Sequence, residues 1–452
     1  MPLYSATTLT QALAELAQRL YDAHPTASPF WTDAEKTIYI QEALRAWNAM
    51  TSFWRVQFVF NTVNGQTWYD LADTTSVANT PRPMSYTDVG VVTEMEYHLL
   101  EPPTGKTWTG SLQFNINDLL QAIARRRDEI VSLSGCTLKQ SLVPANAGMT
   151  ILNDKTIDIR RVAWLPVAGI GYINSSLWPD DTWALQSYER DYTISPPGIP
   201  STYQQSTEPP LSFLTDIDPA VPGNYDVLTV EAGTDLSVII TSILNVPNDW
   251  VWVVKYGALA DLMGRDSVSR DSLRQKYCQM RYQQGLSMLL TSPAVLSARL
   301  NNLPLDVEAL QSADDYRPGW QAEANSQPNT LLIGGLNIIG MAPTPDAAYA
   351  LTLNVVQNAP IPAVGTDLIQ ISRDDYDVIL DYAQHIASFK MGGAEFLATF
   401  PLLQRFYTQC QMYNSKLAQL GEFQKAIYEL SQLQQQFNPT YQSASPADQG
   451  AS

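Results

Sequence analysis

The sequence predicts an α+β protein in which helical hairpins near the N-terminus, in the middle and at the C-terminus are joined by antiparallel β segments. In three regions, apolar residues recur three and four positions apart, as is typical of amphipathic helices. Between these regions, apolar residues alternate with polar ones, as they do in half-buried strands. The 29 prolines and 23 glycines keep each predicted element short.

Changes in this periodicity divide the 452 residues into six regions. A chain of this length is expected to contain roughly two to four domains, each with its own core. The regions are an N-terminal helical region (1–52), a β-rich region with an inserted helix near 115–132 (53–246), a central helix pair (247–292), a loop and second β region (293–370), a C-terminal helical region (371–437) and a flexible tail (438–452).

Two helices are predicted before residue 52. The second begins at a capping box, in which Thr32 accepts a bond from the amide of Glu35 and the Glu35 side chain returns one. Each helix has one apolar face, formed in the first by Leu9, Leu13, Leu16 and Leu20, and in the second by Ile40, Leu44 and Trp47.

The β-rich region opens with a predicted hairpin. Val56, Phe58 and Phe60 alternate with their neighbours, and Asn64-Gly65 is a strong two-residue turn signal before a strand at 67–71. Residues 73–105, which are rich in Thr and Pro, read as a long excursion. Further strands are predicted at 156–165 and 226–230.

Helices follow each of two β stretches. The first helical block begins near Pro247, and the second begins at Ser372 after strands within 331–356, whereas 292–330 read as loop. An apolar stripe then continues along the C-terminal region through Phe406, Cys410, Tyr413, Leu417, Leu420, Phe423, Ile427, Leu430 and Phe437. This stripe fits either a helix packed on its own domain or a seam between subunits.

The two β-then-helix passages resemble each other and suggest a degenerate internal duplication. Residues 222–230 parallel 345–353, residues 253–257 parallel 379–383, and Cys278-Gln279-Met280 recurs as Cys410-Gln411-Met412. Because the identity is low, two unrelated hairpins, each followed by a helix pair, are the alternative.

The composition excludes several classes of protein. Only 16% of residues are charged and 10% are aromatic, so the chain is neither a disordered acidic tail nor a coiled-coil rod. The net charge of −18 argues against a protein that grips duplex DNA. The one basic run, Arg125-Arg126-Arg127, fits the solvated face of a helix. Few charges beside many aromatics suggest surfaces covered by neighbouring subunits, with an ordinary aromatic core as the alternative.

Membrane spans, secretory leaders and cysteines in the sequence indicate the compartment in which the chain is made. No apolar stretch reaches the roughly 18 residues of a membrane span, and residues 1–5 do not begin like a secretory leader. Cys136, Cys278 and Cys410 are odd in number and far apart, so neither a disulfide framework nor a zinc cluster is expected. Synthesis in a reducing cytoplasm is the expectation.

A search for catalytic and cofactor motifs finds none. His24, His98 and His385 are far apart, which excludes a paired-histidine metal motif. Gly105-Lys106-Thr107 ends like a phosphate-binding loop, but prolines precede it, and we expect no nucleotide site. Asp381 and His385 share one helix face and form the one candidate acid–base pair. No cofactor and no metal are predicted.

Two further groups of residues have structural and functional alternatives. The paired carboxylates Asp180-Asp181, Asp314-Asp315 and Asp374-Asp375 fit helix caps better than calcium loops. A glycan-binding module could use tryptophans that stack on sugar rings, although Trp164 lies in an alternating strand and is expected in the core. The tryptophans concerned are Trp108, Trp164, Trp178, Trp183 and Trp320.

Three passages resemble a known class of protein. They are residues 32–47, which form an early helix leading into a strand; residues 156–164 with 250–262 and 277–282, which form a strand followed by a late helix pair; and residues 381–396, which read as a second helix of the same type. Together they are similar to the neck or head-to-tail adaptor (connector) class of tailed-bacteriophage virion structural proteins.

The resemblance implies a structural protein without enzymatic activity. It implies a twelvefold homo-oligomeric ring in the neck or tail region of a virion, beside the portal and tail proteins, with DNA passing through the lumen without specific binding and no membrane involved. In this ring, helices at 250–263 and 382–396 are expected to build the wall. The candidate subunit-interface residues are Trp250, Tyr256, Tyr277, Tyr382, His385, Phe389 and Phe396. Another kind of tail or capsid protein, a glycan-binding module and an enzyme are the alternatives.

Overall fold

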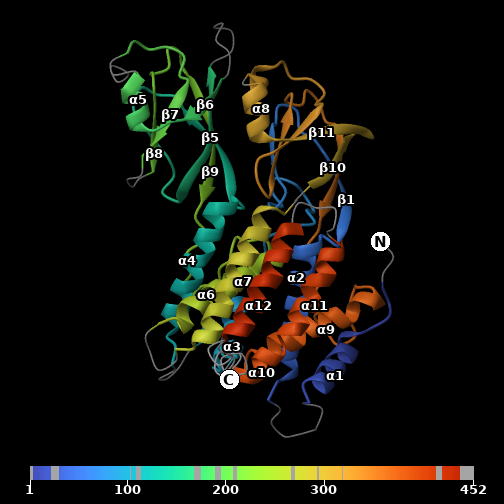
Figure 1. Cartoon of the computed structure of the whole chain (residues 1–452). Helices are drawn as coiled ribbons and strands as arrows, with labels where there is room; N and C mark the ends of the chain where they lie inside the picture. The colour runs from blue at the N-terminus through green and yellow to red at the C-terminus, as the bar shows by residue number, and fades with distance from the viewer. Residues whose placement is uncertain are drawn as a thin grey trace, which may run out of the picture.

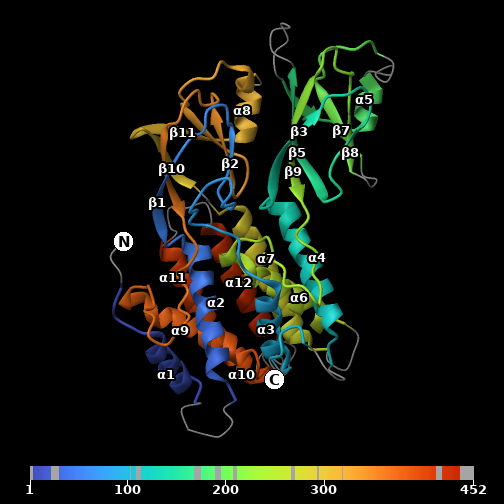
Figure 2. The same cartoon turned by 180° about the vertical axis from the view of Figure 1, so that it is seen from behind.

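Two β lobes lie side by side at one end of a helical body (Figure 1). The computed structural model describes residues 4–21, 30–101, 103–107, 113–166, 175–188, 195–206, 211–265, 270–292, 295–317, 319–413 and 420–437. Both lobes extend from the same end of the body, which is also clear from behind (Figure 2). The chain is an α+β protein, as the sequence predicts.

The first lobe is a seven-stranded sheet built from both ends of the chain. Its strands, in spatial order, are β1 (Arg55–Asn61), β14 (Ala350–Val356), β10 (Val295–Leu300), β11 (Leu303–Ala309), β12 (Thr330–Ile333), β13 (Ile338–Ala342) and β2 (Trp68–Asp70). Neighbours are antiparallel except for β11 and β12, which are parallel. A short helix, α8 (Leu310–Tyr316), connects this parallel pair.

The second lobe is a seven-stranded sheet built from the middle of the chain. Its strands, in spatial order, are β3 (Leu138–Pro144), β9 (Gly223–Glu231), β5 (Thr156–Pro166), β6 (Ser175–Pro179), β7 (Thr202–Gln205), β8 (Ser212–Thr215) and β4 (Thr150–Ile151). Only β6 and β7 are parallel, and α5 (Thr182–Tyr188) follows β6.

The two sheets have the same topology. Numbered along the chain within each lobe, both have the order first, seventh, third, fourth, fifth, sixth, second, with one parallel pair between the fourth and fifth strands. In both lobes the third strand pairs with the seventh across a bulge. The figures place α5 and α8 on corresponding sides of their lobes.

The helices repeat in the same way. A short helix and a 19-residue helix precede each sheet: α1 (Leu9–Arg19) with α2 (Asp33–Thr51), and α3 (Asp88–Leu99) with α4 (Ile116–Ser134). Two helices follow each sheet: the 3₁₀ turn η2 (Asn248–Trp250) and α6 (Val251–Met263) with α7 (Ser272–Leu290), and α9 (Arg373–Ser388) with α11 (Phe400–Tyr413). Outside this pattern are η3 (Trp320–Ala322), α10 (Gly393–Ala398) and α12 (Leu420–Phe437).

Hydrogen-bonding details fix the register of this internal repeat. Thr8 and Thr87 cap α1 and α3, and each forms an isolated antiparallel bridge to a residue before the late helices, Leu368 and Ile243 respectively. The N-caps of α2 and α4 are Thr32 and Asn115, and their left-handed C-caps are Ser52 and Gly135. The shift in residue number from one unit to the other is the same for the N-caps and for the C-caps. The same offset relates Arg55 and Leu138, where β1 and β3 begin.

One repeat is inserted into the other. We name residues 4–70 and 295–413 the split unit, and residues 87–290 the inserted unit. The insertion lies between the second and third strands of the split unit, β2 and β10, where the inserted unit has only a short turn between β4 and β5. The internal repeat is therefore present, but it covers nearly the whole chain and not only the passages that the sequence suggested.

The strand register corrects the alignment suggested by the sequence. Arg55 pairs with Val356 and Leu138 pairs with Val230, so Val230 corresponds to Val356 and not to Leu353. The alignment of 222–230 with 345–353 contains three identities, which are Pro222 with Pro345, Leu228 with Leu351 and Thr229 with Thr352. At low identity, backbone pairing defines the equivalence better than residue type does.

Three local predictions were wrong. Asn64-Gly65 does not close a hairpin, because β1 pairs with β14 and β2 with β13, at opposite edges of one sheet. The excursion at 73–105 contains α3, a helix that is buried along most of its length despite its β-branched residues. Residues 292–330 contain β10, β11 and α8, because long-range pairing with β14 organises them.

Other predictions are confirmed. The strands at 156–165 and 226–230 lie within β5 and β9, Ser372 caps α9, and the helix near 115–132 is α4. The C-terminal stripe folds back as a hairpin, since α12 packs against α11 and α7 of the same chain. The flexible tail, 438–452, lies outside the described residues.

Candidate functional site

The junction between the two units is the most distinctive site of the helical body. Helix α2 of the split unit packs against α3 and η2 of the inserted unit. On the other side, α12 covers α7 and α11, one from each unit. The junction therefore combines helices from segments that are far apart in the sequence.

A buried charged cluster lies at this junction. Lys255 of α6 is 0% exposed and forms ion pairs with Glu42 of α2 and with Glu94 of α3, the second at 3.3 Å. The Tyr256 hydroxyl donates to the Glu42 carboxylate at 3.2 Å, and the Arg45 guanidinium lies 3.6 Å from Glu94. Isolated charges are costly to bury, so the two units pack in the arrangement that brings these charges into pairs.

A second cluster surrounds Arg281 of α7. Its guanidinium is fully buried and donates to the hydroxyls of Tyr382 and Tyr407 in the split unit. It also lies over the Trp252 ring, 4.7 Å from the centroid. The planar guanidinium contacts aromatic faces and hydroxyl groups at the same time, and the ammonium group of a lysine would not reproduce this arrangement.

His385 belongs to the same junction and has no free ring nitrogen. Its Nε2 lies 2.8 Å from the Tyr277 hydroxyl and its Nδ1 lies 2.9 Å from Thr399 Oγ1. Burial, together with the charge of Arg281, holds the pKa of His385 well below its usual range, so the ring is neutral at pH 7. Asp381 instead accepts bonds from Arg19 and Arg405. The candidate acid–base pair is thus not coupled.

The seven candidate interface residues all lie inside the chain. Each is at most 3% exposed in the described structure. These residues pack the two units of one chain together and have no surface left for a second chain. The expectation that they form the interface between subunits is thereby corrected. The residues are Trp250, Tyr256, Tyr277, Tyr382, His385, Phe389 and Phe396.

The contact between the units is head-to-tail, not two-fold symmetric. On one side of the junction, the split unit contributes α2 and the inserted unit contributes α3, η2 and α6; on the other side, α7 of the inserted unit contacts α9 and α11 of the split unit. The counterparts of α3 and α2 have their main contacts within their own units: α1 packs on α2 and α9, and α4 packs on α3, α6 and α7. Figure 1 shows α4 and α1 on opposite flanks of the body.

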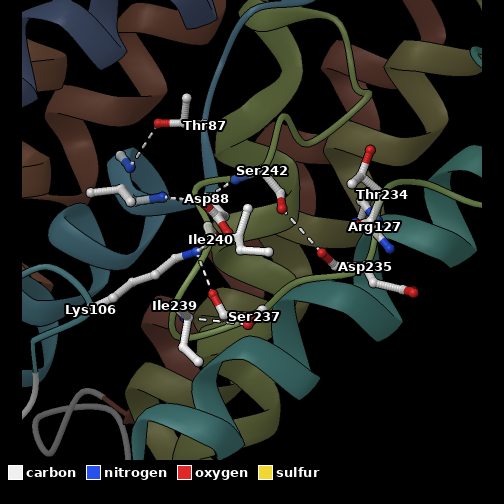
Figure 3. A network of polar contacts seen from close by, with 12 residues as sticks. Thr87, Asp88, Lys106, Arg127, Thr234, Asp235, Ser237, Ile239, Ile240 and Ser242 are labelled. Carbon is white, nitrogen blue, oxygen red and sulfur yellow. Dashed lines mark hydrogen bonds and ion pairs between the residues drawn. The ribbon is translucent and has the colours of Figure 1, made fainter.

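Lys106 anchors a loop on the flank formed by α3 and α4. Its ammonium group forms an ion pair with Asp88, and donates to the carbonyls of Ser237 at 2.7 Å and Ile240 at 2.6 Å (Figure 3). The Asp88 carboxylate also accepts from the Ser242 amide at 3.1 Å. The lysine of Gly105-Lys106-Thr107 therefore has a structural role.

The loop held by Lys106 presents an apolar tip. Ile239 is 92% exposed and Ile240 is 64% exposed. Arg127 supports the same loop from α4, because its guanidinium donates to the Thr234 carbonyl at 2.5 Å (Figure 3). The predicted solvated face at 125–127 is correct only for Arg125, whose side chain is 67% exposed. Arg125 and Arg126 both pair with Asp261, but the Arg126 side chain is mostly covered and Arg127 is buried.

A groove of about 630 Å³ separates the two lobes. Arg161 of β5 spans it and pairs with Asp314 of α8 at 2.7 Å, a bidentate contact completed at 2.9 Å. Half-exposed Trp178 lines the groove, whereas Trp183 on α5 is 84% exposed and is not among the residues that line it. Trp164 and Trp320 are buried, as expected for Trp164, and Trp108 lies outside the described residues.

The part of the chain that the structure describes contains neither a metal-ion cluster nor a membrane-spanning helix. No group of three or more His, Cys, Asp or Glu side chains has a geometry suited to a metal ion there. No helix in the described ranges is long and apolar enough to cross a membrane. Cys136, Cys278 and Cys410 are buried free thiols, and His24 lies outside the described ranges.

Sequence reasoning missed the charged residues that hold the units together. In the sequence, Lys255 interrupts an apolar stretch, and no motif marks Glu42, Glu94 or Arg281. A lysine in an otherwise apolar helix is a usable signal, because such a residue is rarely buried without a partner. No protein-family model and no curated protein sequence matches the chain.

Proposed function

We propose that this protein is a structural subunit of a tailed-bacteriophage virion, a ring-forming head-to-tail adaptor of the neck that joins portal to tail. The observation that carries the proposal is the head-to-tail packing of two like units within one chain. A heterologous contact generates a ring when its rotation closes. The resemblance of the sequence to neck adaptors supplies the class, and the buried polar clusters serve packing in place of chemistry.

The charge of the chain suits a conduit for DNA. A net charge of −18 accompanies only 27 Lys and Arg, and the two arginines that follow Arg125 are engaged within the chain. Few free cations mean few phosphate contacts, so a duplex would slide through a lumen and not be held there. In this proposal the β lobes contact the portal or tail proteins, and the protein acts without a cofactor, metal or enzymatic activity.

One observation favours a second candidate function. Trp183 and Trp178 are exposed on the inserted unit, where they could stack on a sugar ring as in a glycan-binding module. Fluorescence quenching by polysaccharide from a host cell surface tests this candidate. Quenching that is lost in Trp183→Ala would favour glycan binding over a purely structural contact.

The adaptor proposal is tested on the purified chain and on virions. We expect sedimentation velocity and electron microscopy to show closed rings, alone or on isolated portal. We also expect mass spectrometry of purified virions to detect the chain at several copies per particle. A chain that is absent from virions, and that stays monomeric both alone and with portal, would contradict the proposal.

A further inference from the structure

We propose that chains associate through the outer flanks of α4 and α1, in a contact that repeats the junction between the two units of one chain. The inference rests on the proposed ring and specifies its interface. Its occupant is a second copy of this chain: α4 of one chain takes the place that α2 has inside the chain, and α1 of the next takes the place of α3, whereas α9 is already buried within its own chain.

Burial identifies the two flanks as unfilled halves of the same contact. Helix α2 is buried over most of its surface, whereas its counterpart α4 is buried along one face only. Helix α3 is likewise buried along most of its length, and its counterpart α1 buries only Leu9, Ala12 and Leu16. Helices α2 and α3 thus have partners on both sides, and their counterparts α4 and α1 have partners on one side.

The register of the repeat pairs specific residues across the proposed contact. Inside the chain, Glu42 of α2 and Glu94 of α3 face each other through Lys255. The offset that relates Thr32 to Asn115 carries Glu42 to Arg125 of α4. The offset that relates Thr8 to Thr87 carries Glu94 to Glu15 of α1.

The charges at these positions are complementary. Arg125 has a side chain that is 67% exposed and also pairs with Asp261 of its own chain, and Glu15 is exposed on the opposite flank. Two acids that share a lysine inside the chain are thus replaced by one base and one acid. Lys255 corresponds to Leu380 when the starts of η2 and α9 are aligned, and Leu380 is 0% exposed within its own chain, so it supplies no bridging cation to the proposed contact.

If the same contact repeats around the ring, the number of chains follows from the number of units. Because each chain contains two units, a ring of such chains has twice as many units as chains. A ring with the twelve units expected of a twelvefold neck is then built by six chains. A ring of twelve such chains would have twice this mass and would present twenty-four β lobes.

Charge reversal with rescue tests the interface. In the full chain, Arg125→Glu and Glu15→Arg are each expected to raise the concentration at which half of the chains assemble by tenfold or more, measured by sedimentation velocity. The double variant Arg125→Glu/Glu15→Arg should recover most of the loss, because it restores an opposite pair. Arg299→Glu, an exposed reversal on β10, is the matched control and should assemble like the unmodified chain.

A cross-linking experiment keeps the test independent of folding losses. The native thiols are buried, so a chain with Arg125→Cys and Glu15→Cys should form a ladder of linked chains with a short bismaleimide, in rings or in virions. Full assembly of both single reversals, or rings that give no ladder, would overturn this interface and leave the adaptor function standing. Failure of the adaptor function itself would appear as absence of the chain from virions.

Discussion

Asp249 and Asp374 occupy corresponding positions at the starts of the late helices but differ in environment. Asp249 is buried and accepts bonds from Asn48 at 2.6 Å and from the Ala359 amide at 3.1 Å. Burial raises its pKa to about 6 from 3.8, whereas Asp374 is exposed. The same residue type is therefore buried at this position in one unit and exposed to solvent in the other.

This difference predicts a pH dependence of stability. Because the folded state holds the Asp249 proton more tightly than the unfolded state, this group favours folding below about pH 4, and the contribution is lost as the pH rises through 6. From pH 4 to 7, the free energy of unfolding should fall by up to about 3 kcal/mol more in the unmodified chain than in Asp249→Asn. Urea unfolding measures this, and Asp374→Asn should behave like the unmodified chain.

Arg281 gives a second prediction at the residue scale. Arg281→Ala removes the donors to Tyr382 and Tyr407 and leaves a void at the junction, so the free energy of unfolding should fall by about 3–5 kcal/mol. Arg265→Ala, which removes an exposed pair with Asp118, should cost less than about 1 kcal/mol. Equal losses in the two variants, measured in urea, would contradict the importance of the cluster.

Only some residues of the candidate site could be predicted from the sequence. The aromatic stripes around Trp250, Tyr277 and Phe396 were recognised as contact surfaces, but their partner could not be assigned. A stripe that packs on another unit of the same chain needs the same apolar spacing as one that packs on another chain. Only the position of α2 beside α6, which depends on long-range packing, distinguishes the two cases.

At the scale of elements, the close packing of α6 and α7 depends on a glycine. A Cβ atom at Gly285 would lie 2.5 Å from Val253 Cγ2 and 2.8 Å from the Trp252 ring. Gly285→Ala should therefore push the two helices apart and lower the free energy of unfolding by about 1–3 kcal/mol, although Ala favours a helix. Gln283→Ala, exposed on the same helix, should stay within about 0.5 kcal/mol, and thermal unfolding distinguishes them.

Helices with local signals were predicted well, and strands with distant partners were not. The Thr32 and Ser372 caps and the periodic stripe of α1 lie within a few residues of the helices they define. The pairing of β1 with β14 joins residues on opposite sides of the inserted unit, and no local pattern encodes it. The same insertion made the Asn64-Gly65 turn misleading, because the strand after it pairs elsewhere.

At the scale of the whole molecule, the internal repeat explains the composition. The junction between the two units buries aromatic side chains of α2, α6, α7 and α9 in one core, which is consistent with the many aromatic residues of a charge-poor chain. The repeat was suggested by the sequence, but its extent was not, because the inserted unit separates the two halves of the split unit. Topology retains the repeat where residue identity does not.

The central claim is that a ring of this protein contains two like units for every chain. Cryo-electron microscopy of assembled rings, combined with their mass by native mass spectrometry, tests it most directly. The account predicts an even number of β lobes that is twice the number of 50.2 kDa chains, with the lobes alternating between two similar shapes. A ring with two lobes per chain in which α4 and α1 of neighbouring chains lie far apart would contradict it, as would an assembly of chains paired by a two-fold axis.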